Sequence, residues 1–439
     1  MSATPPPRRG PAGMLVDLSP LRDSPAYRRL WIGGVAGGIG VQLTAVAVGI
    51  HVYEISGSVF AVALVGGFAL LPMVVFGLLG GVIVDAFDRR TTLIVCSIVA
   101  LASTVGLAAL AFADVTALGG YYALTTVGST AGTLVGTARF AILPRLVPRH
   151  QLTAASALSG ISAGLQVAIG PMLAGILVAA TGYGVTYSID AVLYALGFLG
   201  IITLPRIPPS PDAPRLGLRA VVEGVRFVVT ARSLRLAIGM HAVAIVLARP
   251  HVLFPAIAAT LLGGGAVTVG ALASAAAIGV LLSGLLSGPV TRYRWHGTGI
   301  GLASLATGAT TIAFGLVLLA SEQTATGAVS DEAARLAPIA LAMVVLASWG
   351  VADNASNIFR TTMLHAATPD HVRGRLQGVF TVILTAGPRL GDFVIGSLAA
   401  LTTLWLPSIA AGLVLLLIVG LLLALNPLFR RYDAEDPRP

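Results

Sequence analysis

Charge is scarce in this sequence. Aspartate, glutamate, lysine and arginine together make up 10% of its 439 residues, whereas about 25% is usual for a soluble domain. Hydrophobic residues make up 56%. This composition excludes an ordinary soluble globular protein and indicates a membrane protein.

Lysine is absent, and all 27 basic residues are arginine. If the amino terminus is cytoplasmic, Arg139, Arg249 and Arg389 lie within predicted spans, Arg335 faces outward, and every other arginine falls in a cytoplasmic loop or tail. Because cytoplasmic segments carry the excess of basic residues, both termini are predicted to be cytoplasmic. The net charge of +9 fits contact with membrane lipid, whereas no basic run is interleaved with aromatic residues as nucleic-acid binding requires.

Cysteine occurs once, and recognisable metal-binding or catalytic motifs are absent. Cys96 falls in the third predicted span, where a packed thiol is expected because no second cysteine is available for a disulfide. The seven histidines show no HExxH or CxxC spacing. We therefore expect no metal, no cofactor and no enzymatic activity.

Long apolar runs, by contrast, are abundant. About twelve of them reach roughly 20 residues, the length that crosses a hydrocarbon core of about 30 Å. The runs are continuous, so they predict helices and not the alternating strands of a membrane barrel. They begin near Tyr27, Val59, Thr91, Gly119, Ala154, Gly184, Leu236, Val267, Gly297, Ala337, Leu376 and Leu404.

The second half of the chain repeats features of the first at a constant offset of 221 positions. PRHQLTAAS and PDHVRGRLQ each stand between two apolar runs and each keep a histidine two places after the proline. This offset predicts an all-α membrane protein of twelve transmembrane helices in two related six-helix bundles. The matching positions are Pro148 and Pro369, His150 and His371, Gly170 and Gly391, and Gly175 and Gly396.

Composition shifts divide the chain further. The start, MSATPPPRRGPAG, lacks the apolar core of a cleavable signal and predicts a disordered cytoplasmic tail. The segment after the sixth run opens with PRIPPSPDAP and continues as an amphipathic helix, which either lies on anionic lipid or makes a regulatory contact. The predicted parts are a tail over 1–26, bundles over 27–204 and 236–428, a cytoplasmic linker over 205–235 and a tail over 429–439.

The stretch GGVIVDAFDRRTTL, between the second and third runs, resembles the cytoplasmic loop motif of the major facilitator superfamily. Its matching residues are Gly81, Asp85, Arg89 and Arg90. The opening YRRLWIGGVAGGIG, the aspartate of VDAFDRR and the stretch TPDHVRGR narrow the resemblance to the branch that contains the enterobactin exporter and the macrolide efflux proteins. This resemblance covers nearly the whole chain. It implies proton-driven efflux through a central cavity by rocking of the two halves.

Two stretches depart from the patterns of that superfamily. GPVTRYRW, the second-half counterpart of the loop motif, has Arg292 where the first half has Asp85. AIGPMLAG resembles the antiporter motif through Gly170, Pro171 and Gly175, although other expected glycines are replaced. Glycines in such a span also serve close helix packing.

Ionisable groups within the spans are the candidates for proton coupling, since a charge at the bilayer centre costs at least about 2.5 kcal/mol. Asp392 is the first choice, because the resemblance carries an acid at this position. Its neighbour Arg389 could instead form a self-neutralising pair with it. Asp353 is either a coupling residue or a helix-contact residue. Asp190 is a further coupling candidate, although structural roles are favoured for Asp190 and Arg139.

Polar residues deep in other spans are candidates for the substrate cavity. Arg249 precedes Pro250, which should kink the helix, and the cation suits either an anionic substrate or a structural pair with a carboxylate. Trp349, Asp353 and Asn357 share one helical face that should line the cavity, and Arg360 on that face should reach the cytoplasmic boundary. The last cavity candidate is Gln42, central in the first span.

A cytoplasmic gate is also predicted. Asp85 should approach the start of the eleventh span, where Arg373 and Arg375 and the unpaired backbone donors provide positive potential.

The sequence thus predicts a proton-driven exporter of small amphiphilic molecules in a bacterial cytoplasmic membrane, acting as a monomer. A siderophore-type substrate is favoured, and a multidrug or macrolide efflux pump is the alternative. Because a fold does not fix a function, a membrane sensor or enzyme on a transporter fold stays as a third hypothesis.

Overall fold

The computed structural model describes residues 17–204, 226–288, 293–325, 332–367 and 370–433. Residues 1–16 of the tail predicted over 1–26, most of the linker and Arg292 lie outside these residues, whereas the described part of that tail contains a short helix, Ser19–Asp23. Within them the chain forms helices and short connections, with one isolated bridge between Trp295 and Asp433 and no strand.

Capping residues set several helix starts in the amino-terminal half. The side chains of Ser24, Ser58 and Asp88 each accept a hydrogen bond from a backbone N–H in the following first turn, which satisfies a donor that the helix leaves free. The elements are α1 (Ser19–Asp23), α2 (Pro25–Ser56), α3 (Val59–Ala86), α4 (Arg89–Phe112), α5 (Leu118–Leu146), η2 (Arg149–Gln151) and α6 (Leu152–Ile202).

Helix α6 contains two membrane spans. Its 51 residues would extend about 77 Å as one straight helix, far more than a bilayer core of about 30 Å. The break falls at Gly182, whose φ of 77° and ψ of 177° only glycine adopts readily. The two spans predicted from Ala154 and Gly184 therefore meet at a glycine corner without a loop.

The carboxy-terminal half begins with a broken span. Arg249 has extended backbone angles, and Pro250 has no N–H to continue the helical ladder, so α8 ends and a short 3₁₀ segment follows. This break lies where Pro250 was predicted to kink the seventh span. The elements are α8 (Arg232–Leu247), η3 (Pro250–Leu253), α9 (Phe254–Thr260), α10 (Gly265–Leu285), α12 (His296–Ala325), α13 (Glu332–Ala367), α14 (Asp370–Leu401), α15 (Leu406–Leu425) and α16 (Pro427–Arg430).

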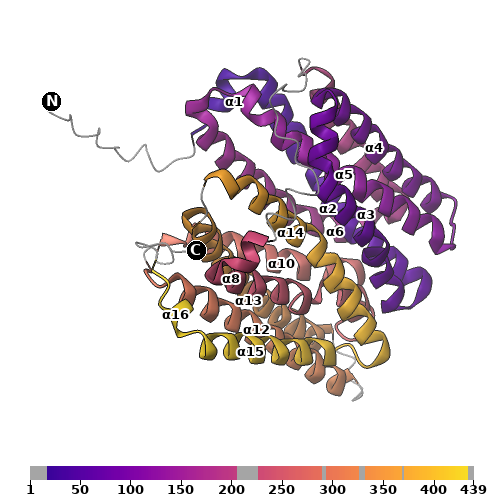
Figure 1. Ribbon diagram of the computed structural model, residues 1–439. Coiled ribbons are helices and arrows are strands. Elements are labelled where there is room, and N and C mark those ends of the chain that lie inside the picture. Colours follow the sequence, from indigo (N-terminus) through magenta and orange to yellow (C-terminus); the bar gives the residue numbers. More distant parts are fainter. Residues whose placement is uncertain (1–16, 205–225, 289–292, 326–331, 368–369, 434–439) are drawn as a thin grey trace.

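Ten helical segments of the described residues are long and apolar enough to cross a membrane, with the broken seventh span counted as one. The long α6 supplies two crossings, and α5, with 29 residues, supplies one more. The described chain thus makes twelve crossings, six in each half. The predicted all-α fold of two six-helix bundles is confirmed, and Figure 1 shows the amino-terminal bundle in indigo to magenta beside the carboxy-terminal bundle in red to yellow.

The repeated glycines make equivalent helix contacts in the two halves. Gly170 brings α6 against α2, and its counterpart Gly391 brings α14 against α8. Gly175 approaches the backbone of α10, and its counterpart Gly396 approaches α3. The first pair therefore packs helices within a half, whereas the second pair packs one half against the other. The offset seen in the sequence is a structural repeat.

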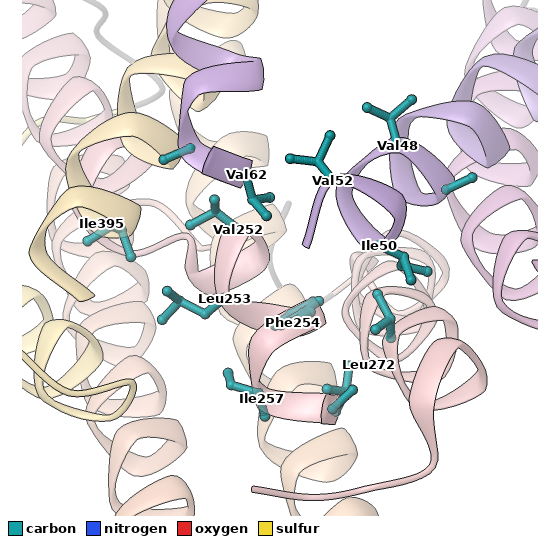
Figure 2. Packing of buried hydrophobic residues seen from close by; sticks show 14 of the residues in the cluster. Val48, Ile50, Val52, Val62, Val252, Leu253, Phe254, Ile257, Leu272 and Ile395 are labelled. Atoms are coloured by element: carbon teal, nitrogen blue, oxygen red, sulfur yellow. The ribbon is translucent and has the colours of Figure 1, made fainter. Parts of the chain in front are cut away.

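A single large apolar cluster joins the halves at the far end of the molecule, the end at which α2 finishes and α3 begins. Figure 2 shows Val48, Val52 and Val62 of the amino-terminal half gathered with Phe254 and Ile395 of the carboxy-terminal half. The other clusters found among the described residues each stay within one half. The protein is therefore closed at the far end.

Candidate functional site

Two adjoining cavities lie near the contact between the bundles, one between the two halves and one mainly within the amino-terminal half. The central cavity, of about 320 Å³, is lined by Gln42 from the first half and by Arg249, Arg389 and Asp392 from the second. The larger cavity, of about 410 Å³, is lined mainly by α2, α4, α5 and the second span of α6. Both cavities share Gln42 and Arg389 in their linings. Four of the predicted site residues thus come together from spans far apart in the sequence.

The central cavity is rich in positive charge. Arg389 Nη1 lies 3.7 Å from Asp392 Oδ2, one turn further along α14. Arg249 makes no hydrogen bond or ion pair within 4 Å to a described residue, and its Nε is buried without a partner. It interacts at longer range with Asp392 and Asp353. The carboxylate partner that would make Arg249 purely structural is therefore not in direct contact with it among the described side chains.

Close helix packing aims these groups into the cavity. Gly391 lies against the backbone of Val246, at the end of α8 just before the break that carries Arg249. On the opposite side, a Cβ added to Gly66 of α3 would lie 3.3 Å from both the Arg389 carbonyl oxygen and the Asp392 Cβ. Helix α14 is thus held between α3 and α8, and Asp392 stands where the two halves meet.

Asp190 belongs to the larger cavity. Its Oδ2 accepts hydrogen bonds from Thr44 Oγ1 at 2.5 Å and Thr104 Oγ1 at 3.5 Å. Its Oδ1 is buried without a partner, and the side chain is 1% exposed. Gly40 leaves the space that this carboxylate occupies. Two threonines therefore hold a buried acid at the edge of a cavity, an arrangement that sequence spacing did not reveal.

The predicted face of the tenth span does not line either of these cavities. Trp349 is buried and packs edge-on against His251, with ring centroids 5.5 Å apart. Asn357 Oδ1 accepts a hydrogen bond from Arg360 Nη2 at 3.1 Å. Asp353 interacts electrostatically with Arg249 and Arg360. The cavity and coupling roles of Trp349, Asn357 and Asp353 stay predictions.

Arg360, predicted to reach toward the cytoplasmic boundary, does not extend its side chain to the protein surface. Its side chain is 1% exposed, and besides Asn357 its Nη1 contacts Ser356 Oγ at 3.3 Å. The guanidinium has acceptors one turn earlier on its own helix, so it has no need to reach the surface.

His251 was not predicted as a site residue. It follows Arg249 and Pro250 at the helix break, lines the central cavity, and keeps a buried Nδ1 without a partner. A helical wheel could not place it there, because the break after α8 changes the direction in which the side chain points.

The loop motif is described only in part. Gly81 and Asp85 lie in α3 and Arg373 and Arg375 in α14, but their side chains fall outside the described structure, so the predicted gate is untested.

In the described part of the motif, Arg89 is buried at the start of α4, where Asp88 Oδ1 accepts from Thr91 N at 2.9 Å. Arg90 Nη2 donates to the Ile202 carbonyl at the end of α6, at 2.6 Å. The motif thus ties α4 to α6, and a cation at a helix carboxy-terminus is favourable there.

The antiporter-like motif lies where α6 meets α10 of the other half. Gly175 has its close neighbours at Ala266 and Val267, and a Cβ added to Gly270 would lie 2.6 Å from the Pro171 carbonyl oxygen. Small residues on both helices let the backbones approach. Gly170 contributes to the packing of α6 on α2 instead.

Twelve membrane helices arranged as two related bundles define a transporter of the major facilitator superfamily. Residues 16–439 match the family model described as transmembrane secretion effector, and the chain belongs to this family. It is a multi-pass membrane transporter with a binding site for small molecules.

Similar proteins agree in fold and length. The chain is 27% identical over 429 residues to the enterobactin exporter EntS of Shigella boydii serotype 18, with 97% of each chain covered. It is 26% identical, with the same coverage, to EntS of Escherichia coli O139:H28. A POT family transporter in complex with 5-aminolevulinic acid superposes with a TM-score of 0.71 at 12% identity, covering 92% of this chain and 97% of that one. The nucleoside transporter NupG gives 0.65 at 14% identity, covering 91% and 98%. At these identities the two solved structures support the fold alone.

Proposed function

We propose that this protein is a proton-driven exporter of small acidic amphiphiles, with a siderophore-type substrate favoured. The observation that carries the proposal is Arg249, whose guanidinium lines a cavity between the halves and has no direct carboxylate partner among the described residues. An arginine in a water-poor site binds a carboxylate or phenolate oxygen well. The printed name of the similar EntS proteins, enterobactin exporter, supports export and a siderophore.

Asp392 is the proposed coupling residue, since it stands at the contact of α14 with Gly66 of α3. A carboxyl group is cheaper to bury when protonated, whereas the carboxylate favours a hydrated environment. Proton binding therefore stabilises the state in which α3 and α14 are packed at the far end. Loss of the proton, together with binding of an acidic substrate by Arg249, then favours the opposite state, which is open at the far end. Arg389, Asp353 and Asp190 are proposed to tune or share this step.

The test is transport by the purified chain in liposomes. A siderophore-type acid should move against its gradient when a proton gradient is imposed, and its addition should cause measurable proton movement. A sensor or enzyme on a transporter fold would show no substrate-dependent proton movement. That result would reject the exporter proposal.

A multidrug or macrolide pump is the second candidate. The free Oδ1 of Asp190 in the larger cavity favours it, because a cationic drug would seek a carboxylate. Deletion of the gene separates the two. Loss of a secreted acidic metabolite supports siderophore export, whereas greater drug susceptibility with unchanged secretion supports the pump.

We further propose that both termini are cytoplasmic and that the chain acts as a monomer in a bacterial cytoplasmic membrane. In this proposal the bundles span 27–204 and 236–428, the linker over 205–235 lies on the lipid surface, and the tails are 1–26 and 429–439. Single-cysteine labelling from either side of the membrane tests the orientation.

A further inference from the structure

A second arginine faces a cavity without a hydrogen-bond or ion-pair partner among the described residues. Arg139 lies on α5 and lines the larger cavity. Among the described residues none hydrogen-bonds or ion-pairs with its guanidinium, and its Nε is buried and unsatisfied. A cation at this depth is costly unless an opposite charge compensates it.

The internal repeat supplies a comparison within the same chain. Arg139 precedes Pro148 by nine positions, and Arg360 precedes Pro369 by nine, so the two arginines are equivalent across the 221-residue offset. Both terminal nitrogens of Arg360 have acceptors, Ser356 Oγ and Asn357 Oδ1, and the charge of Asp353 lies on the same helix, so that only its Nε lacks a partner among the described residues.

The amino-terminal half has none of these acceptors. The positions equivalent to Asp353, Ser356 and Asn357 are occupied by Gly132, Val135 and Gly136. A Cβ added to either glycine would meet nothing within 4 Å, so the space along this face of α5 is open. One half therefore surrounds its arginine with acceptors, whereas the other keeps the arginine and opens the space beside it.

Neighbouring groups shape this space. Gly34 of α2 leaves room for the guanidinium, since a Cβ there would lie 2.9 Å from Arg139 Nη1. Gln166 is fixed nearby by donating from Nε2 to the Gly34 carbonyl and to Ser162 Oγ. Asp190 lies in the same cavity and repels an anion from its own end. These charges direct an acidic group toward Arg139.

We propose that the larger cavity is a second subsite for an acidic group, held by Arg139. Guanidinium groups bind carboxylate and phosphate oxygens in pairs, and the cavity of about 410 Å³ accommodates the aromatic or aliphatic body attached to such a group. Because this cavity adjoins the central one, a substrate with two acidic groups reaches both Arg139 and Arg249. Only the simultaneous contact of one substrate with Arg139 and Arg249 rests on the proposed function.

Equilibrium dialysis of the purified full chain tests the subsite. Radiolabelled salicylate serves as the acidic probe and salicylamide as its neutral analogue, in detergent without phospholipid. Arg139→Gln should weaken salicylate binding at one site by about tenfold or more, the loss of one charged hydrogen-bonding partner. Arg145→Gln, at an exposed position on the last turn of the same helix, should bind salicylate as the unaltered protein does.

A second variant keeps the arginine and gives it an internal partner. Gly132→Asp copies the carboxylate that Asp353 provides in the other half, so it should compete with salicylate and reduce binding by a similar factor. Gly132→Leu fills at least as much space without charge and should retain binding. An equal loss of salicylate binding in both variants would mean that the space in the cavity, and not charge, determines binding. That result would overturn the proposal.

Thermal unfolding separates binding from folding. Arg139→Gln should unfold near the temperature of the unaltered protein, whereas Arg360→Gln should unfold earlier and still bind salicylate. Unchanged salicylate binding in Arg139→Gln, or an equal loss of salicylamide binding, would overturn the subsite.

The acidic group could belong to a free molecule or to a lipid headgroup, and added phosphatidylglycerol distinguishes these sources. If phosphatidylglycerol displaces salicylate only when Arg139 is present, the natural ligand of the subsite is a lipid headgroup. If it displaces no salicylate, the natural ligand is a free acid. Dialysis uses no gradient, so failure of proton-driven transport would leave this result intact.

Discussion

Asp392 is the residue proposed to bind the proton that changes the contact between the halves. We expect Asp392→Asn to abolish proton-driven efflux and to leave membrane insertion intact, because the amide mimics the protonated acid and cannot release a proton. Transport in liposomes with and without an imposed proton gradient measures the effect, and Asp392→Glu serves as the matched control. Full activity in Asp392→Asn would move the coupling role to Asp353 or Asp190.

Arg249 is the residue expected to select the charge of the substrate. Arg249→Gln should reduce transport of anionic substrates by about tenfold or more, since a hydrogen bond to a charged group contributes about 1.5–3 kcal/mol. Neutral substrates of similar size should be affected much less. Competition assays with a matched acid and amide give the comparison. An equal loss for both, together with poor folding, would indicate a structural pair instead.

Much of the central cavity could be predicted residue by residue. Depth in a span and the cost of a buried charge were enough to select Arg249, Arg389 and Asp392, which the structure places around one cavity. The same reasoning was less useful for Trp349 and Asn357. Helical spacing shows which residues share a face, but only the packing of other helices decides whether that face meets a cavity.

At the scale of elements, the contact of α6 with α10 is expected to change if the halves rock as proposed. We expect Gly175→Ala to insert normally and to transport several-fold more slowly, because its Cβ would press on the backbone of Ala266 and Val267 in the other half. Gly160→Ala on the same helix is the matched control, since a Cβ there meets nothing within 4 Å. Transport rates are compared at equal amounts of inserted protein, so that a slower rate reflects hindered motion and not poor packing of the helices. Equal rates in the two variants would contradict the prediction.

The order and type of the elements could be predicted from the sequence, but the geometry of the links between consecutive spans could not. Apolar length predicted the fifth and sixth spans, and Pro250 predicted the weak point of the seventh. The corner at Gly182 depends on one left-handed glycine, and no pattern distinguishes that glycine from the others in α6. The 3₁₀ segment after Arg249 was likewise not predicted, because a proline indicates a break but not the conformation that follows it.

At the scale of the whole molecule, we propose that a gate at the other end alternates with closure at the far end. We expect Asp85→Asn to shift the population toward the state closed at the far end and to slow turnover, because the predicted contact with Arg373 and Arg375 forms only in the opposite state. Substrate preference should change little. Spin-label distances between the starts of α4 and α14 measure the shift, and an unchanged distribution would leave Asp85 with a folding or topology role.

The repeat offset predicted two halves, but it could not predict which end of the molecule is closed. Apolar residues occur along the whole length of the spans, so composition does not indicate which end is closed. The choice depends on the side chains that meet across the halves, such as Val52 and Phe254.

We expect the apolar cluster at the far end to give the proposed transport cycle a thermal signature. Each opening at that end exposes apolar side chains to water, which adds about 0.45 cal/K/mol of heat capacity per Å². The equilibrium between the two states must therefore curve with temperature. Because the hydrophobic driving force weakens on cooling, a colder membrane favours the state that is open at the far end.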